Sequence, residues 1–484
     1  MEIVLLVLFI VNMIFISTMV FFERKKPQAI IVWTLVLILF PVLGFILYAI
    51  LGNGLSIKTR RMLKNQSVMW EELKTLVCSQ KQAITNKELR SNFVAAKNKQ
   101  LIILNIDSCG SVYTENNDIK IFTNGKKKLE SLINDIKAAK QTINLCYYIY
   151  ASDETGNAVS EILKQKAKQG VTVNLLIDGF GSKRFKRKKF KELLNAGVNI
   201  CEFFPPLRIF RSVNLRLNYR NHRKIAVIDG KIGYIGGVNI RNDHMEVGEK
   251  ALPWRDGHIR VVGDCVFDLQ RLFLKDWRFS YAPARKKDYD LERYFVVNDE
   301  VINNCGVQIV HSGPDDNREQ IKLAMIKMIT SATKKVCLQS PYFVPDDSFL
   351  DAIKSAALSG VEVNIMIPKL PDQIIPYYAS LSYCEDLVAY GVNVYAREGF
   401  IHAKTLLVDD EVCMIGSCNS DIRSFSLNFE GCAVVYDKNI AGQMGKIFNE
   451  DKAKSVGLNA AYFKSLSKGK KALKSFCRLF SGVL

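Results

Sequence analysis

Two long apolar runs at the start of the chain dominate its pattern of hydrophobic and polar positions. Residues 3–22 form one uncharged run, and residues 29–51 form a second with Trp33 and Tyr48 towards its ends. Each run is long enough to span a bilayer as a helix, and aromatic residues near the ends of such helices favour the headgroup zone. No basic segment precedes the first run, which disfavours a secretory signal peptide. The pattern predicts a transmembrane hairpin within residues 1–52.

The rest of the chain alternates helical periodicity with short apolar runs. Residues 158–169 and 349–359 have the apolar spacing of a helix, and a glycine follows each stretch. A β-branched apolar run comes next in both places, as expected for a buried strand. This alternation predicts an α/β fold, preceded at residues 53–115 by a polar, helical connector.

Two apolar segments recur later in the chain, which indicates a long-period duplication. The matching pairs are GVTVNLLI at 170–177 with GVEVNIMI at 360–367, and AGVNI at 196–200 with YGVNV at 390–394. We therefore predict two pseudo-symmetric α/β domains, a first at 116–295 and a second at 296–484, the latter with a basic C-terminal tail.

A third repeated segment carries polar residues at the same offsets in both halves. Its members are His222, Lys224, Asp229, Gly236 and Asn239 in the first half, and His402, Lys404, Asp409, Gly416 and Asn419 in the second. The pattern H-x-K-x4-D, followed by G-(G/S)-x-N, begins with an apolar, strand-like block in which residues two apart share a face. Two complete copies of this pattern would not be expected by chance. We therefore predict one functional site built from both halves.

The chemistry of these residues suits a phosphodiester substrate. A histidine can attack phosphorus or protonate an oxygen while the neighbouring lysine neutralises a phosphoryl oxygen. Asn239 and Asn419 follow small residues at strand ends, where a side-chain amide can donate to a phosphate. Asp229 and Asp409 have the opposite strand parity and precede turn-forming residues, so we expect both to be structural.

An attacking histidine also needs an acceptor that holds its other ring nitrogen. Each half offers one acid directly before a matching strand, Asp256 in the first half and Glu430 in the second. We predict that these carboxylates orient the histidines; the alternative is an ordinary solvated acid at the start of a strand. Three further histidines have no counterpart in the other half and are expected to be structural or surface residues: His244, His258 and His311.

On these paired motifs the chain resembles the phospholipase D superfamily. Over nearly its whole length it is similar to the bacterial cardiolipin synthases, including the hairpin and the segments at 253–256, 312–315 and 423–430. The resemblance implies one shared active site with His222 as nucleophile and His402 as general acid and base. It also implies transfer of a phosphatidyl group between two phosphatidylglycerols, giving cardiolipin and glycerol, without metal, nucleotide or other cofactor. The symmetric repeat alone does not decide which histidine attacks.

The excess of Lys and Arg over Asp and Glu gives the chain a formal net charge of +19. This charge predicts an anionic partner. Seven cations and two aromatic residues lie within 183–191, and an insertion before the first motif holds Arg208, Arg211, Arg216 and Arg220. Since the hairpin holds the protein at a membrane, we expect these segments, and the tail at 464–484, to engage anionic membrane lipids rather than nucleic acid. The sequence does not indicate an oligomeric state.

The spacing of the twelve cysteines indicates the redox state of the compartment that holds the protein. They include no CxxC pair, which favours free thiols in a reducing compartment and argues against a disulfide scaffold or a zinc site. The five histidines also lack metal-ligand spacing, so no metal is expected. The basic residues of the loop at 24–26 nearly balance those that follow the second run, Lys58, Arg60, Arg61 and Lys64, so charge alone does not fix the orientation in the cell membrane. The free thiols favour catalytic domains on the cytoplasmic face.

Other functions are compatible with the same motifs. A phospholipase D-type hydrolase would use water as acceptor and a related transferase another alcohol, a choice that depends on the shape of the pocket. A superfamily nuclease is disfavoured by the two predicted membrane spans. A non-catalytic lipid-binding scaffold would not require two complete His-Lys-Asn sets.

Overall fold

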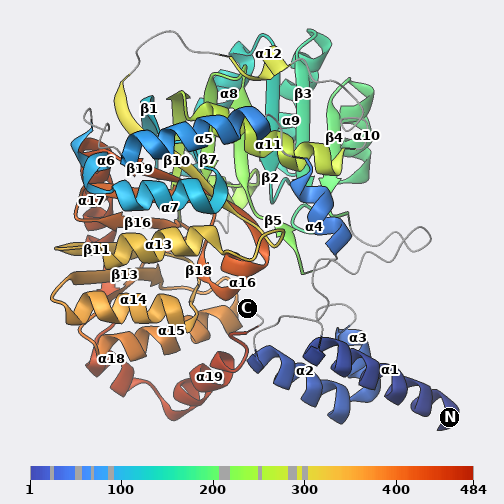
Figure 1. The fold of residues 1–484 in the computed structure, drawn as a ribbon, viewed down its shortest axis with the longest axis vertical. Coiled ribbons are helices and arrows are strands. Elements are labelled where there is room, and N and C mark those ends of the chain that lie inside the picture. Colours follow the sequence, from blue (N-terminus) through green and yellow to red (C-terminus); the bar gives the residue numbers. More distant parts are fainter. Residues whose placement is uncertain are drawn as a thin grey trace.

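The computed structural model shows a large α/β body and a small helical N-terminal unit (Figure 1). Figure 1 also shows that the helical unit lies at one end of the molecule's long axis. The structure describes residues 2–21, 27–48, 57–66, 70–85, 92–205, 218–248, 253–281, 291–296 and 303–482.

The N-terminal unit consists of α1 (Glu2–Phe21), α2 (Pro27–Leu39) and α3 (Pro41–Leu47). The second apolar run is therefore not one continuous helix. Pro41 has no amide hydrogen, the backbone at Phe40 leaves the helical region (φ −129°, ψ 70°), and α3 begins at the proline. Among the described residues, no helix is both long and apolar enough to cross a membrane. The transmembrane hairpin stays a prediction, and residues 23–26 of its loop lie outside the described residues.

The body is built on one sheet of sixteen strands. The first half of the chain supplies β1 (Thr114–Phe122), β2 (Thr142–Tyr147), β3 (Thr172–Asp178), β4 (Asn199–Phe203), β6 (Lys224–Ile228), β7 (Ile232–Gly236) and β9 (His258–Gly263). The second supplies β10 (Asn304–Ser312), β11 (Lys335–Gln339), β13 (Glu362–Pro368), β14 (Asn393–Arg397), β16 (Thr405–Val408), β17 (Val412–Gly416) and β19 (Asn428–Tyr436).

The strand order shows the duplication directly. It runs β20-β14-β13-β11-β16-β17-β19-β10-β1-β9-β7-β6-β2-β3-β4, with β20 (Ser455–Gly457) at one edge. Equivalent strands stand at equal places on either side of the β1–β10 junction, and β1 pairs with β10 antiparallel. The prediction of two pseudo-symmetric α/β halves is therefore confirmed.

Short strands outside this path join distant segments. β5 (Arg220–Asn221) pairs with β19, and β8 (Trp254–Arg255) pairs with β15 (Phe400–Ile401), so both pairs link one half to the other. β12 (Phe343–Val344) pairs with β18 (Ser420–Asp421) within the second half.

Helices cover the faces of the sheet (Figure 1). Those before the sheet are α4 (Ile57–Lys64), α5 (Trp70–Thr85), α6 (Phe93–Lys97) and α7 (Lys99–Cys109). The first half has α8 (Gly125–Ala138), α9 (Glu154–Lys168), α10 (Arg187–Asn195), the 3-10 helix η2 (Asn242–Met245), α11 (Val266–Ser280) and α12 (Leu291–Tyr294). The second half has α13 (Gln320–Thr330), α14 (Asp347–Leu358), α15 (Ile374–Val388), α16 (Ile422–Ser426), α17 (Lys438–Ala453), α18 (Ala460–Ser465) and α19 (Lys468–Arg478).

The two helices predicted ahead of buried strands are α9 and α14, and they begin and end in the same way. Asp153 and Asp346 cap them, because each carboxylate accepts a hydrogen bond from a backbone N–H in the first turn. A glycine at positive φ follows each helix, Gly170 at 87° and Gly360 at 86°. Glycine adopts this conformation without steric cost, so the chain turns there into the next strand.

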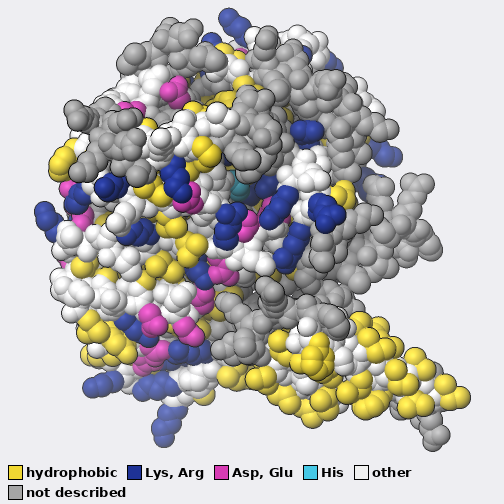
Figure 2. All heavy atoms as spheres, in the orientation of Figure 1, with side chains coloured by type: hydrophobic (Ala, Val, Ile, Leu, Met, Phe, Trp, Pro, Cys, Tyr) yellow, Lys and Arg dark blue, Asp and Glu magenta, His cyan; other side chains and the backbone are white. Residues whose placement is uncertain are grey.

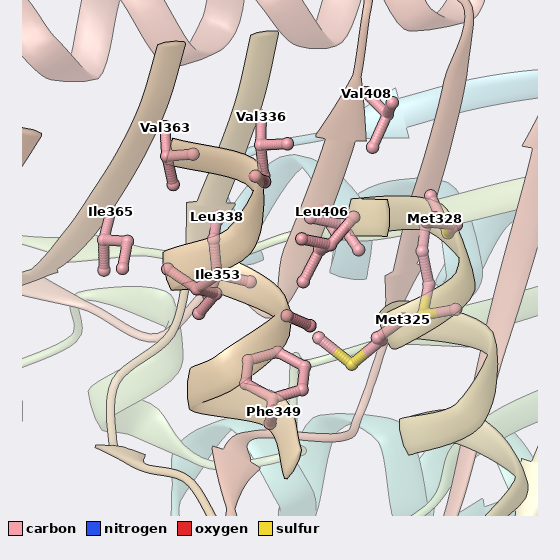
Figure 3. Close-up of a cluster of buried hydrophobic side chains, with 14 of the residues drawn as sticks. Met325, Met328, Val336, Leu338, Phe349, Ile353, Val363, Ile365, Leu406 and Val408 are labelled. Atoms are coloured by element: carbon pink, nitrogen blue, oxygen red, sulfur yellow. The ribbon is translucent and has the colours of Figure 1, made fainter. Parts of the chain in front are cut away.

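The core of the second half lies between its helices and the sheet. Figure 3 shows side chains of α13 and α14 facing those of β11, β13 and β16. Residues of the predicted connector belong to the same cluster, namely Val94, Leu101, Ile102 and Ile106. The connector is thus helical, as expected, but it is not polar throughout, because the inner face of α7 completes this core.

Candidate active site

The two motif histidines lie where the halves of the chain meet. His222 stands between β5 and β6, and its backbone N–H donates to the carbonyl of Phe429 at 2.9 Å. His402 stands between β15 and β16, and its backbone N–H donates to the carbonyl of Arg255 at 2.6 Å. Each histidine is therefore tied to the opposite half, one residue before the acid that the sequence nominates there.

Each nominated carboxylate contacts the histidine of the other half. Nδ1 of His222 lies 2.9 Å from Oε1 of Glu430, and Nδ1 of His402 lies 2.8 Å from Oδ2 of Asp256. Both acids are fully buried, so neither is a solvated strand-start residue. An ionised carboxylate can only accept, so each Nδ1 carries the hydrogen and each Nε2 keeps its lone pair. The repeat assigns one acid to each half but does not reveal this exchange of partners.

The two motif lysines lie beside their histidines. The ammonium of Lys224 donates to the carbonyl of His222, and that of Lys404 to the carbonyl of His402, both at 2.5 Å. Burial lowers the pKa of Lys224 to about 7 and that of Lys404 to about 8, although the nearby carboxylates oppose this effect. An anion bound next to these lysines would favour their charged forms, so phosphate binding and lysine protonation are coupled.

Burial also lowers the pKa of both histidines. That of His222 falls to about 4 in spite of Glu430, and that of His402 is held well below its ordinary value in spite of Asp256. Both imidazoles are therefore neutral near pH 7 in the free protein. A neutral imidazole whose Nδ1–H is held by a carboxylate presents its Nε2 lone pair to an electrophile.

Small residues beside the acids differ between the halves. A Cβ at Gly237 would collide with Oδ1 of Asp256, so glycine is required there. At the equivalent position Ser417 donates its hydroxyl to Oε2 of Glu430. The difference between Gly237 and Ser417 in the two G-(G/S)-x-N segments therefore follows from the lengths of the two acids.

The motif asparagines follow strand ends, as expected, but their surroundings differ. Oδ1 of Asn239 accepts from the backbone N–H of Ile149 at 3.1 Å, which leaves its amide nitrogen 3.4 Å from Nε2 of His244. Among the described residues, Oδ1 of Asn419 has no hydrogen-bond partner. Donation from either amide to a phosphate stays a prediction.

His244 belongs to this site, a placement that sequence reasoning missed. It lies in η2 and is 2% exposed, and its ring centroid is 4.1 Å from that of Trp254 and 5.1 Å from that of His402. Its Nδ1 is 3.7 Å from Oδ2 of Asp256. The repeat gives no signal for His244 because the second half has serine at the equivalent position. Its place five residues after Asn239 is the one clue in the sequence.

The same cluster has the composition of a metal site. His244, Asp256 and His402 place ligand atoms within 4.8 Å of one another, a grouping that could hold an ion. Two imidazoles and one carboxylate suit zinc. However, the Asp256 carboxylate already accepts from His402, so a bound metal would break the contact that holds this histidine. The expectation of a metal-free site stays a prediction.

Asp229 and Asp409 lie in the turns that follow β6 and β16. Both have positive φ, 50° and 53° respectively. Each carboxylate accepts from three successive backbone N–H groups, those of Lys140, Gln141 and Thr142 for Asp229, and those of Thr333, Lys334 and Lys335 for Asp409. These contacts tie the motif strands to the starts of β2 and β11. The geometry is that of structural residues rather than reacting groups.

The basic insertion before His222 is described only at its end. Arg208, Arg211 and Arg216 lie outside the described residues. Arg220 lies in β5, with its guanidinium 4.6 Å from the ring centroid of Phe180. A role of this insertion in lipid binding stays a prediction.

Family comparisons match the parts of the chain that carry these features. The profile of a family described as cardiolipin synthase, PLD-like domain, matches residues 132–251 and 325–452, and so includes both His-Lys-Asp motifs. A second profile, described as phospholipase D-nuclease N-terminal, matches residues 4–53. The first match covers one segment in each half, as the duplication requires.

Curated relatives align over nearly the whole chain. A cardiolipin synthase of Oceanobacillus iheyensis is 40% identical over 478 residues, which is 98% of this chain and 98% of the relative. A major cardiolipin synthase of Bacillus subtilis is 42% identical, covering 93% of this chain and 92% of its own. A cardiolipin synthase of Staphylococcus aureus is also 42% identical, over 98% of this chain and 95% of the relative.

A solved structure has the same fold. The phosphatidylserine synthase of Haemophilus influenzae superposes with a TM-score of 0.58, covering 76% of this chain and 95% of that structure. The two sequences are 17% identical, so this likeness supports the two-halved architecture alone.

Proposed function

The chain belongs to the cardiolipin synthase family of phospholipase D-like proteins, and on this premise we propose that it transfers a phosphatidyl group from one phosphatidylglycerol to another, giving cardiolipin and glycerol. The observation that carries the proposal is the crosswise pair of His–carboxylate contacts, His222 with Glu430 and His402 with Asp256. Two imidazoles with free Nε2 atoms provide one nucleophile and one acid–base partner. A double displacement at phosphorus needs both.

In the first displacement, Nε2 of His222 attacks the phosphorus of the donor lipid. A P–N bond forms, the P–O bond to the glycerol headgroup breaks, and His402 gives its proton to the departing oxygen. The products are free glycerol and a phosphatidyl group on His222. His402 can hold that proton because the anionic phosphodiester raises the pKa of an adjacent imidazole.

In the second displacement, neutral His402 takes the proton from a glycerol hydroxyl of the acceptor phosphatidylglycerol. That oxygen attacks phosphorus, the P–N bond breaks, and His222 leaves as a neutral imidazole. Cardiolipin is released, and His402 is protonated again for the next donor. Each displacement inverts the phosphorus centre, so the net result is retention.

The remaining buried groups stabilise charge rather than form bonds. Lys224 and Lys404 neutralise the phosphoryl oxygens, on which negative charge builds up during each displacement. Glu430 supports the positive charge that develops on His222 when its Nε2 is bonded to phosphorus, and Asp256 does the same for protonated His402. Asn239 and Asn419 are proposed to donate their amide hydrogens to the same phosphoryl oxygens.

The proposal includes a place in the cell. The segment at 1–52 anchors the catalytic domains at the cell membrane, on its cytoplasmic face, where the phosphatidylglycerol of the inner leaflet is within reach. The N-terminal profile match at residues 4–53 and the long apolar runs support an anchor in this position.

Lipid products distinguish this function from its alternatives. Purified full-length protein, incubated with phosphatidylglycerol in detergent without added metal, should give cardiolipin and glycerol in equal amounts. Phosphatidic acid with glycerol would instead identify a hydrolase that uses water as acceptor, and the substrate assignment would then be wrong.

A further inference from the structure

The C-terminal helix α19 turns two of its charged side chains, Lys474 and Arg478, towards the protein. Lys474 is 5% exposed and forms an ion pair with Glu385 of α15. Arg478 pairs with Asp386 at 2.5 Å, and its guanidinium lies 4.5 Å from the ring centroid of Tyr383. The inner face of this helix therefore combines two charged side chains, paired with acids of α15, with the buried Cys477.

The outer face of α19 and of the turn after it is apolar. Leu473, Phe476, Leu479 and Phe480 are 37%, 57%, 79% and 37% exposed, and the rings of Phe476 and Phe480 lie 5.3 Å apart. Positions three and four residues apart on a helix share one side. A surface helix of a water-soluble body has the reverse arrangement, with apolar residues inward and charges outward. The polarity of α19 therefore suits an apolar environment outside the body.

Cations stand at the start of the same helix. Lys468, Lys470 and Lys471 are all exposed, and none of them has an ion-pair partner among the described residues. Figure 2 shows Lys and Arg side chains projecting from the end of the molecule where α18 and α19 lie in Figure 1. An apolar stripe with flanking cations matches helices that lie in the interface of an anionic membrane.

The more basic segment at 183–191 has the opposite arrangement. It leads into α10, whose Leu193 is fully buried in the core and whose Lys189 pairs with Glu192 at 3.0 Å. Its cations face solvent, as in an ordinary surface helix. Figure 1 places α10 and α19 towards opposite ends of the long axis, so they belong to two separate surfaces of the body.

We propose that α19 docks on the surface of an anionic phospholipid bilayer through its outward apolar stripe, and that the segment at 183–191 does not. This inference goes beyond the proposed transfer reaction and rests on it only for the choice of an anionic lipid surface. The docked helix would hold the second half of the catalytic body against the leaflet that contains the substrate.

Hydrogen exchange tests the proposal without turnover, so its failure is distinct from failure of the proposed function. Full-length protein is compared in nanodiscs of phosphatidylglycerol, in nanodiscs of phosphatidylcholine and in detergent. We expect amides of residues 468–480 to exchange about tenfold more slowly in phosphatidylglycerol, because docking suppresses fraying of the helix. Amides of α10 should be unchanged. Protection of α10 without protection of α19 would overturn the proposal.

Matched variants show whether the stripe is responsible. Phe476→Ser with Leu479→Ser should remove the protection, whereas Leu194→Ser, at a 43% exposed leucine of α10, should leave it intact. Lipid-independent protection that grows with protein concentration would mean that a second copy of the chain covers the stripe, and it would contradict bilayer docking. Protection of α19 that survives the double substitution would contradict it as well.

Discussion

The two half-sites hold the same catalytic pair with different acids. Around His222 the acid is Glu430, whose longer side chain leaves room for Ser417 to donate a hydroxyl hydrogen. Around His402 the acid is the shorter Asp256, which lies so close to the backbone that only Gly237 fits beside it. Duplication therefore kept the positions of the reacting nitrogens while the supporting residues changed together in each half.

The surroundings of the two acids differ in a second respect. Asp256 lies next to His244 and also accepts from the indole N–H of Trp254 at 3.3 Å, so aromatic rings enclose His402. Glu430 has no second imidazole beside it among the described residues, and it accepts from the hydroxyl of Ser417 and the side-chain amide of Asn428 instead. This asymmetry is consistent with two histidines that perform different steps.

Removal of either histidine should have the largest effect. His222→Ala and His402→Ala should each lower turnover by at least about 10⁴-fold, because each one removes a partner from the single shared site. Cardiolipin formation from phosphatidylglycerol measures the loss, and circular dichroism controls for folding. Substantial activity in either single variant would show that the halves work independently.

Exchange of the small residues beside the two acids, Gly237 and Ser417, should lower activity by different amounts. Gly237→Ser should lower kcat by about 100-fold, because the new Cβ displaces Asp256 and with it His402. Ser417→Gly removes the hydrogen bond that the hydroxyl donates to Glu430 and the one that it accepts from the backbone N–H of Gly431, but it displaces no acid, so a loss of about tenfold is expected. Steady-state kinetics of both variants check this order, and equal losses would contradict the inferred link between acid length and its small neighbour.

The pH profile should report the lysines of both halves. A lysine neutralises phosphate only while protonated, and the pKa of Lys224 is lowered to about 7 and that of Lys404 to about 8. On the alkaline side kcat/KM should fall as the free protein loses the proton that His402 must donate, and it should fall more steeply as the pH rises through 7 to 8. On the acid side it should fall near pH 4 as His222 takes up a proton. The fall in kcat should occur at higher pH, since bound phosphate favours the charged lysines. A flat kcat/KM between about pH 6 and 9 would contradict the buried environment of these lysines.

The smallest effect on chemistry is expected at the motif aspartates. Asp229→Asn weakens the contacts to three backbone N–H groups but tolerates the positive φ, so the free energy of unfolding should drop by about 1 kcal/mol. Chemical denaturation measures this drop, and kcat should stay close to that of the parent. A variant that is fully folded but inactive would give Asp229 a direct role in the reaction.

Local pattern was enough to predict much of this molecule. The helices before the buried strands follow from local spacing, and the paired His-Lys-Asp motifs, both acids and the two α/β halves follow from local patterns that recur in the second half of the chain. The crosswise exchange of Asp256 and Glu430 does not, because it depends on how the halves pack. His244 was not assigned to the site because it occurs in one half only. The buried face of α7 was not predicted because it depends on packing against the second half.

The covalent intermediate tests the account most directly. Full-length protein is quenched during turnover of phosphatidylglycerol, digested, and its peptides are analysed by mass spectrometry. The account predicts a phosphatidyl adduct on the peptide that contains His222 and its absence from the His222→Ala variant. An adduct confined to the His402 peptide would reverse the roles of the two half-sites, and cardiolipin formation without any adduct would contradict the double displacement.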